Sequence, residues 1–413
     1  MTAEYFDALE TRDPHAREEA IFAALPARIA YAKAKAPAFA RLFDGVDPRE
    51  IASRAALSHL PVTRKAELAE LQKSSRPFGG FAAGGYGTIA RAYASPGGIY
   101  EPEGRSADWW RLARALFAAG FRRGDLVHNC FAYHLTPAGF MLEGGAQALG
   151  CTVFPGGTGQ TELQVQAMAD LSPAGYVGTP SFLRIILEKA DELGVELPSL
   201  RKALVSGEAF LATHREALVA RGITGYQVYA SADLGSIAYE TPAREGLVVD
   251  EGVLVEIVRP GTGDPVPDGE VGEVVVTTLA NEDYPLIRFS TGDLSAVLPG
   301  VSPCGRTNLR IKGWMGRADQ TTKVKGMFVH PGQVAAIVAR HPEIARARLV
   351  VENPDGQDRM TLHAEAREGA TLASDAVVAT IRDVTKLRGD VLACSAGTLA
   401  NDGKVIDDRR KYE

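Results

Sequence analysis

Residues 174–194 read AGYVGTPSFLRIILEKADELG, in which a short apolar strand (174–180) runs directly into a helical stretch. Further segments of the chain have the same strand-like form, at 125–133, 150–157, 201–208 and 225–233. Helical patterns lie between them, around 137–149 and over 160–170. Short apolar strands that alternate with helices are typical of βαβ units and a largely parallel sheet. The sequence therefore predicts an α/β fold.

The pattern changes on both sides of this region. Helices are predicted over 14–42 and 106–119, and after residue 246 strands joined by Gly, Pro and Asp turns indicate an antiparallel β region. The last ~95 residues again mix strands and helices. We expect a large N-terminal domain over 1–318, with mostly parallel sheets flanked by helices plus the antiparallel region, and a small α+β domain over 319–413.

Bulk composition excludes several classes of protein. A chain of 413 residues is too long for one compact core, which predicts at least two domains. The net charge of −6 gives no basic excess for nucleic acid or an anionic membrane. The N-terminus lacks the apolar core of a signal peptide, no window approaches 18 apolar residues, and the four cysteines form no disulfide framework. We expect a cytoplasmic protein without nucleic-acid or membrane partners.

Candidate ligand-binding residues follow the strands. Ligands of open parallel sheets bind beyond the carboxyl ends of the strands, which directs attention to 94–102, 155–161, 206–210 and 229–233. Glu208 could accept a hydrogen bond from an amine, Tyr229 could stack on a base, and Asp233 could hold Mg²⁺ through oxygen. Each junction read alone is equally compatible with a tight turn or a strand cap.

Charged residues in the second half of the chain form further candidates. Asp293 follows a Thr-Gly turn, which suits a carboxylate that binds ribose hydroxyls but also an ordinary Asx turn. The segment GRADQTTKVKG (316–326) precedes the final domain and has the composition of a solvated linker. Lys404 follows Gly403 near the end, where a lone lysine is usually a surface charge.

The order of these segments resembles that of the phenylacetate–coenzyme A ligases, a family of the adenylate-forming superfamily. The resemblance runs from roughly residue 55, where HLPVTRKAELAEL fits, to the C-terminus. The segments that carry it are PGGTGQTELQ, TPSFLRI, SGEAF, YASAD, DPVPDGEVGEVVVTTL, RFSTGDL, PCGRT, GRADQTTKVKG and NDGKVIDDRR. The resemblance implies a carboxylic acid substrate, MgATP and coenzyme A as co-substrates, a C-terminal lid domain, and a possible homodimer.

The resemblance also implies roles for individual residues. Lys404 is the adenylation lysine, Asp233 meets Mg²⁺, Asp319 is the hinge, and Lys323 and Gly326 line the coenzyme A tunnel. The expected nucleotide-binding residues are Ser95, Gly97, Gly98, Ser206, Gly207, Glu208, Tyr229, Ala230, Ser231, Asp293 and Arg317. The expected acyl-pocket residues are Tyr133, His134, Phe210 and Ile237, which suit an aromatic or arylacetic acid.

The sequence departs from the family pattern at the phosphate loop. The segment ASPGGIYEP (94–102) aligns with a Ser/Thr/Gly loop that ends Gly-Lys-Pro, so Glu101 stands in place of the lysine. Facing a triphosphate at contact distance, Glu101 would repel it by about 1–4 kcal/mol. Ala230 replaces a glycine and Asp233 a longer glutamate.

Of the zinc ligands found in some relatives only Cys304 is present, with Ser302 and Val248 near the other positions, so we expect no zinc.

Three functions remain open at this stage. The first is an ATP-dependent acid–coenzyme A ligase. The second is an adenylate-forming enzyme that passes the acyl group to an amine, a carrier protein or a reductase. The third is a non-catalytic ligand-binding relative, which the altered loop favours and which Asp293, Arg317 and Lys404 oppose.

Overall fold

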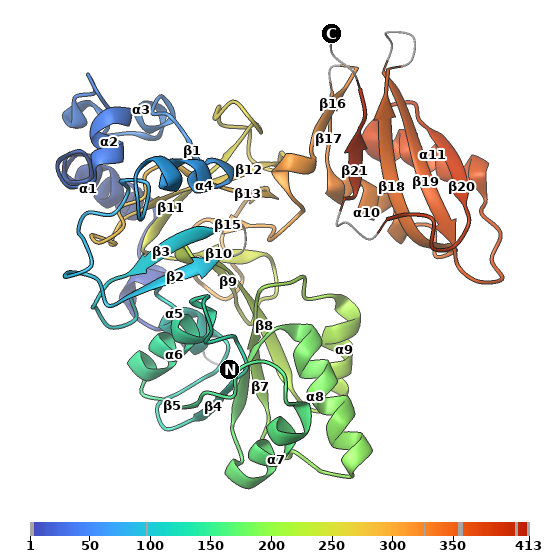
Figure 1. Cartoon of the computed structure of the whole chain (residues 1–413), viewed down its shortest axis with the longest axis horizontal. Coiled ribbons are helices and arrows are strands. Elements are labelled where there is room, and N and C mark those ends of the chain that lie inside the picture. The colour runs from blue at the N-terminus through green and yellow to red at the C-terminus, as the bar shows by residue number, and fades with distance from the viewer. Residues whose placement is uncertain (1–3, 96–97, 326, 354–357, 401–403, 411–413) are drawn as a thin grey trace. The chain divides into compact units, whose positions relative to one another are not determined.

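A computed structural model describes residues 4–95, 98–325, 327–353, 358–400 and 404–410. The chain forms two compact units (Figure 1). The first comprises residues 1–291 and 295–314, and the second comprises residues 292–294 and 315–413. The mixed α/β architecture agrees with the expected fold class. The domain boundary at 318/319 stays a prediction.

A nine-stranded sheet organises the first unit. Its strand order is β14-β15-β10-β9-β8-β7-β6-β4-β5. Five strands are parallel: β4 (Leu126–Asn129), β5 (Thr152–Phe154), β6 (Gly175–Gly178), β7 (Lys202–Val205) and β8 (Thr224–Ser231). The others extend it in antiparallel pairing: β9 (Gly235–Glu240), β10 (Leu247–Val249), β14 (Val297–Leu298) and β15 (Arg310–Ile311). The parallel part carries the strand ends at which ligand residues are expected.

Helices cover both faces of the parallel strands. They are α5 (Ala113–Ala118), α6 (Ala138–Leu149), α7 (Thr161–Leu171), α8 (Pro180–Leu193) and α9 (Ala212–Ala220). Val177 and Leu204 share one core cluster with residues of α5 and α6, whereas Tyr176 and Ala203 share another with residues of α7, α8 and α9. Successive strand residues point to opposite faces, so these apolar runs are buried on both sides.

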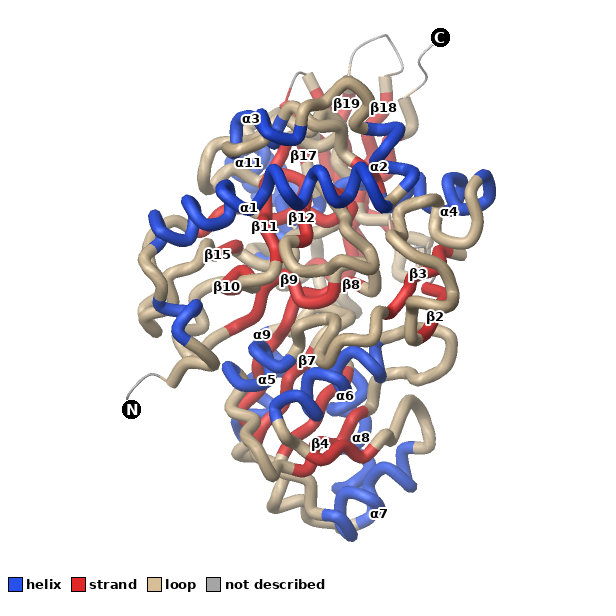
Figure 2. The backbone as a smooth tube through the Cα atoms, turned by 90° about the vertical axis from the view of Figure 1, so that its left-hand side faces the viewer, coloured by secondary structure: helices blue, strands red, loops and turns tan. Residues whose placement is uncertain are grey.

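A second sheet has the order β1-β13-β12-β11. Its strands are β1 (Thr63–Arg64), β11 (Val253–Val258), β12 (Gly272–Thr278) and β13 (Phe289–Ser295). The region is antiparallel as expected, except that β1 pairs in parallel with β13. The helices before residue 80 are α1 (Pro14–Lys35), α2 (Pro37–Leu42), α3 (Arg54–Ser58) and α4 (Lys65–Ser74), with short 3-10 turns at Ala8–Thr11 and Pro48–Glu50. Helix α1 crosses β11 and β12 in the view of Figure 2, and Arg28 Nε donates to the carbonyl of Thr278 at 3.1 Å.

Two predicted helices are shorter than expected. The helix predicted over 14–42 is divided at Ala36, because Pro37 lacks the N–H that would continue it and instead begins α2. The helix predicted over 106–119 is restricted to α5, because Asp108 and Arg111 adopt positive φ values of 47° and 61°. The two tryptophans just before α5 are therefore not on a helix.

Strands β2 (Arg91–Ser95) and β3 (Ile99–Glu103) form a separate hairpin.

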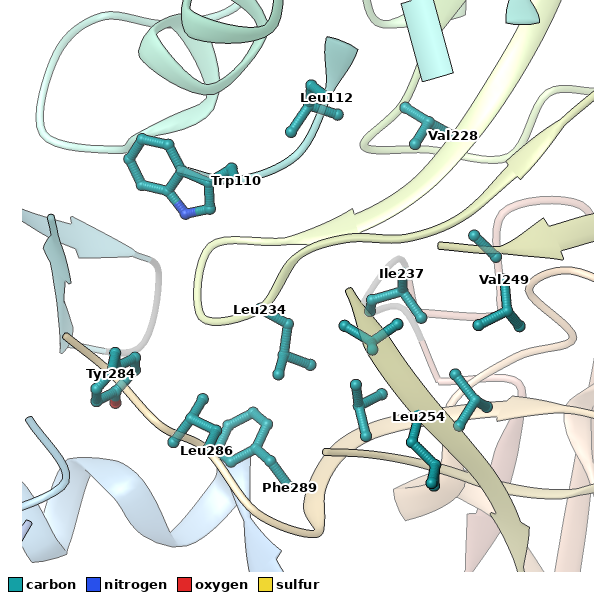
Figure 3. Close-up of a cluster of buried hydrophobic side chains, with 14 of the residues drawn as sticks. Trp110, Leu112, Val228, Leu234, Ile237, Val249, Leu254, Tyr284, Leu286 and Phe289 are labelled. Carbon is teal, nitrogen blue, oxygen red and sulfur yellow. The ribbon is translucent and has the colours of Figure 1, made fainter. Parts of the chain in front are cut away.

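The apolar core lies between the sheets, and Figure 3 shows Leu234, Ile237 and Leu254 within one buried cluster together with Tyr284 and Phe289. No helix among the described residues is long and apolar enough to cross a bilayer.

The second unit has its own sheet and core. The sheet order is β20-β19-β18-β21. The elements are a 3-10 turn at Ala318–Gln320, β16 (Thr322–Val324), β17 (Met327–Val329), α10 (Pro331–Ala339), β18 (Ile344–Glu352), β19 (Arg359–Ala366), α11 (Ser374–Thr385), β20 (Asp390–Cys394) and β21 (Ile406–Asp408). Residues of α10 and α11 pack on this sheet in a separate hydrophobic cluster.

Adjacent glycines on α6 provide a test of how closely this helix packs. A Cβ at Gly145 would lie 2.6 Å from Leu112 Cβ and 2.9 Å from the backbone N of Ala113, whereas a Cβ at Gly144 meets nothing within 4 Å. We expect Gly145→Ala to lower the free energy of unfolding by ~1–3 kcal/mol through overpacking. We expect Gly144→Ala to raise it by ~0.5–1 kcal/mol through helix propensity. Urea denaturation measures both, and equal effects would contradict the close approach of α6 to the start of α5.

Candidate active site

The carboxyl ends of the parallel strands bring three sequence-predicted segments together. Ser206, after β7, donates from Oγ to the carbonyl of Val228 on β8 at 2.7 Å. Glu208 Oε1 accepts from the backbone N of Ser181, in the first turn of α8, at 2.7 Å. Gly207 between them has a φ of 84°, a conformation that favours glycine. In this structure the Glu208 carboxylate thus caps a helix N-terminus, and its proposed place beside an adenine stays a prediction.

Tyr229 links the nine-stranded sheet to the four-stranded sheet that contains β13. Its hydroxyl donates to Thr291 Oγ1 on β13 at 3.0 Å. The pairing of β8 with β9 shifts register between Tyr229 and Ala230, and Ser231 Oγ accepts from the backbone N of Leu234 at 3.3 Å. Asp233 lies in the turn between β8 and β9, just beyond this irregularity.

Asp233 is fully buried and ion-paired. Lys65 Nζ lies 2.5 Å from Asp233 Oδ2, while Asp233 Oδ1 is buried with no hydrogen-bond partner in the structure. The Lys65 side chain remains 24 % exposed, against 0 % for Asp233. Lys65 was not among the residues expected at the site, although its segment carried part of the resemblance. A lone lysine in the sequence gives no signal of a partner that lies 168 residues away.

Glu101 turns inward from the hairpin. It has no exposed surface, it accepts a short hydrogen bond from Ser95 Oγ, and its Oε2 has no hydrogen-bond partner. Burial, and then the charge of Asp233, raises the pKa of Glu101 from 4.5 to about 7. The hydroxyl of Tyr284 is likewise buried without a partner, and its pKa is raised by burial and by the charges of Asp233 and Glu101. A carboxyl group in this environment favours its protonated form.

The hairpin tip that contains the predicted phosphate loop is described in part. Ser95 ends β2, and Gly98 has a φ of 73° just before β3. Gly97 lies outside the described residues. Glu101 itself lies in β3, and its side chain points to the interior rather than to solvent.

The second unit holds Asp293 and Arg317 as an ion pair. Arg317 Nη1 lies 3.1 Å from Asp293 Oδ1, and their backbones form an isolated antiparallel bridge. Gly292 has a φ of 74°, and a Cβ there would lie 2.8 Å from Arg317 Nη2. Glycine is therefore required at this turn both for its backbone conformation and for the approach of the guanidinium.

Lys404 is exposed, and its carbonyl accepts from Arg348 Nε at 3.1 Å. The next residue, Val405, donates its N–H to Gln320 Oε1 at 2.7 Å. Asp319 lies in the 3-10 turn with Gln320, and Lys323 lies in β16. Gly326 lies outside the described residues.

The expected acyl-pocket residues lie in two kinds of environment. Asn129 Nδ2 donates to Tyr133 Oη at 2.8 Å, and Tyr133 Oη donates to Glu143 Oε2 at 2.8 Å. His134 is exposed. Phe210 and Ile237 are instead packed in the two hydrophobic clusters of the first unit. A lining role for these four side chains stays a prediction.

Cys304 lies among hydroxyl groups rather than among zinc ligands. Its Sγ is 3.1 Å from Ser302 Oγ and 3.4 Å from Thr241 Oγ1, and Arg306 Nη1 lies 3.5 Å away. Burial opposes ionisation of the Cys304 thiol, but these hydrogen bonds outweigh it and lower its pKa. Val248, near the expected histidine position, is buried in β10. The part of the chain that the structure describes contains no group of three or more His, Cys, Asp or Glu residues suited to a metal ion.

The raised pKa of Glu101 has a measurable consequence for stability. Glu101 holds its proton more tightly in the folded than in the unfolded chain, so the free energy of unfolding should fall as the pH rises from about 4.5 to about 7. Glu101→Gln keeps an acceptor for Ser95 and removes this titration. We expect the free energy of unfolding of the variant, relative to that of the parent, to rise by up to about 3 kcal/mol between pH 5 and pH 8. Urea denaturation tests this, with the exposed Glu67→Gln as the control, and parallel curves for parent and Glu101→Gln would contradict it.

Comparisons with known proteins agree on one family. A family model described as AMP-binding enzyme matches residues 129–280. Phenylacetate-coenzyme A ligase of Thermus thermophilus is 33 % identical over 373 residues, which cover 85 % of this chain and 83 % of that protein. The enzyme of the same name from Aromatoleum evansii is 32 % identical over 361 residues, covering 83 % and 80 %.

Solved structures show the same architecture. A 2-hydroxyisobutyryl-CoA ligase in complex with 2-HIB-AMP and CoA superposes with a TM-score of 0.85 at 25 % identity, over 97 % of this chain and 93 % of that one. Apo MatB from Rhodopseudomonas palustris, at 17 % identity and a TM-score of 0.55, shares the fold. With relatives above 30 % identity over most of both chains, this protein belongs to the phenylacetate–coenzyme A ligase family of ATP-dependent, AMP-forming acid–CoA ligases.

Proposed function

We propose that the acid activated by this ligase is an aryl or arylacetic acid. The observation that carries the proposal is the aromatic pair after β4, where the rings of Tyr133 and Phe140 meet edge to face with centroids 5.1 Å apart. A carboxylic acid that reacts beyond the ends of the parallel strands would lie near this segment. Aromatic side chains favour an aromatic ligand through offset and edge-to-face contacts. The names of the phenylacetate-activating relatives support the same class of substrate.

The reaction has two half-reactions with different charge requirements. In the first, a carboxylate oxygen attacks the α-phosphorus of ATP, the acyl-adenylate forms and pyrophosphate leaves. In the second, the thiol of coenzyme A attacks the acyl carbonyl, the thioester forms and AMP leaves. The first step brings two anions together, so positioned cationic donors stabilise its transition state by roughly 2.7–4 kcal/mol each.

We assign the nucleotide to the residues that follow the parallel strands and to the Asp293–Arg317 turn. Ser206, Gly207 and Glu208 would border the adenine, and Tyr229, Ala230 and Ser231 would form the neighbouring wall. The support for this assignment is that the hydrogen bonds of Ser206 and Glu208 hold three successive strand ends at one edge of the sheet. Ser95, Gly97 and Gly98 would lie at the phosphates, and Asp293 and Arg317 would meet the ribose and the α-phosphate.

Asp233 fits a Mg²⁺ ion that arrives with ATP. Its Oδ1 atom is buried without a hydrogen-bond partner, and such an oxygen is a suitable ligand for the ion. Mg²⁺ usually takes one or two carboxylates together with waters and substrate phosphates, so a single protein carboxylate suffices. The bound ion would offset the negative charge of the phosphates.

We assign the adenylation step to Lys404 and the change between half-reactions to the segment around Asp319. A lysine presents a compact charge on a flexible stem, which suits a residue delivered by a small domain. A few backbone dihedral angles near Asp319 would absorb the domain movement. Lys323 and Gly326 would then line the path of the pantetheine thiol.

The substrate proposal is tested by AMP release from ATP over a panel of acids, measured with and without coenzyme A. We expect phenylacetate or benzoate to give the highest kcat/KM, above acetate and 2-hydroxyisobutyrate. A preference for a small aliphatic acid would overturn the aromatic assignment. Acid-dependent adenylate formation without any coenzyme A product would favour an amine, carrier protein or reductase as acceptor.

The role of Lys404 is tested by separating the half-reactions. Lys404→Ala should slow adenylate formation by roughly 10²–10³-fold, because the cation that stabilises the transition state is lost. Thioester formation from supplied acyl-adenylate should stay close to the parent rate. Arg340→Ala removes an exposed charge of the same unit and serves as the control. Equal losses in both half-reactions would mean that Lys404 is structural.

A further inference from the structure

A cluster of ionisable side chains contains the expected Mg²⁺ ligand. It comprises Lys65, Glu101, Asp233 and Tyr284. The resemblance to the family places Glu101 where a loop lysine is expected. We infer that Lys65 supplies the positive charge that binds the pyrophosphate portion of ATP, in place of the lysine that the hairpin lacks. This inference rests on the proposed function, because it requires the nucleotide to lie beside Asp233.

The backbone fixes Lys65 at this place from both sides. Lys65 begins α4 directly after β1, and β1 is held by the pairing of Thr63 with Phe289 and of Arg64 with Ser290 on β13. Further along α4, Gln72 exchanges two hydrogen bonds of 2.8 Å with the backbone N and O of Tyr100 on β3. One helix therefore joins β13, the β2–β3 hairpin and, through Lys65, the β8–β9 hairpin.

The exposure of the pair shows where an anion could approach. Asp233 has no exposed surface, whereas the Lys65 side chain is 24 % exposed, so the ammonium group lies between a buried carboxylate and solvent. A lysine ammonium has three N–H donors. One of them binds Asp233 Oδ2. The others can bind phosphate oxygens from the open side.

The glutamate at the lysine position does not oppose this arrangement. Glu101 is fully buried and accepts from Ser95 within its own hairpin. The groups that face it are Asp233, Lys65 and the hydroxyl of Tyr284. The carboxyl group of Glu101 is thus turned away from solvent, whereas the Lys65 side chain keeps 24 % of its surface exposed.

The test compares ligands that differ only in their phosphates. We expect Lys65→Met to weaken binding of ATP and of inorganic pyrophosphate by at least tenfold in calorimetry, and to change AMP binding less than threefold. Lys65→Arg should restore much of the loss because it keeps the charge. Lys73→Met is the matched control, since Lys73 lies on the same helix but pairs with the exposed Glu70.

A second variant protects the test against misfolding. Lys65→Met leaves Asp233 buried without a partner, so Lys65→Gln, whose amide can still donate to Asp233, is measured beside it with thermal unfolding. The same selective loss of ATP and pyrophosphate is expected. Unchanged ATP binding, or equal loss of AMP and ATP in a folded variant, would overturn the assignment. A parent protein that binds neither nucleotide would overturn the proposed function itself.

Discussion

A carboxylate without exposed surface needs a cation, and the Lys65–Asp233 ion pair meets that need at the centre of the site. Removing one partner of such a pair typically costs 3–5 kcal/mol, because the other charge stays buried. The constraint therefore fixes more than two side chains. The ion pair ties α4 to the turn between β8 and β9. Gln72 holds the same helix to β3, and the pairing of β1 with β13 fixes the start of the helix. The strand ends that carry the nucleotide candidates are positioned within this frame.

The second unit is organised by its own internal contacts. Arg317 forms an ion pair with Asp293. Three residues further along the chain, Gln320 accepts a hydrogen bond from the backbone of Val405, beside Lys404. Residues far apart in the sequence are thus joined into one body. The hydrogen bond from Val405 to Gln320 thus holds the backbone beside Lys404 against the 3-10 turn that contains Asp319.

The sequence predicts the periodic parts of the molecule well and the long-range pairings poorly. The strands of the parallel sheet and their helices follow from apolar periodicity, because both faces are buried and each strand is bounded by Gly, Pro or Asp. The segment 106–119 misled the prediction, since Asp108 and Arg111 adopt left-handed conformations that the apolar spacing does not reveal. The parallel pairing of β1 with β13 joins residues more than 200 positions apart, and the Lys65–Asp233 contact depends on it. No local pattern encodes such a contact.

The environment of Glu101 determines how its carboxyl group behaves in the folded chain. The resemblance to the family places an acid here where a phosphate-binding lysine is expected. In the structure the side chain points inward, accepts from Ser95 and favours the protonated form because burial and Asp233 both oppose its ionisation. The raised pKa of Glu101 reduces the negative charge of this carboxyl group near neutral pH. The Lys65 side chain, which pairs with Asp233, is the partly exposed charged group of the same cluster. The inward direction of Glu101 is thus a feature of the folded chain that the sequence alone does not reveal.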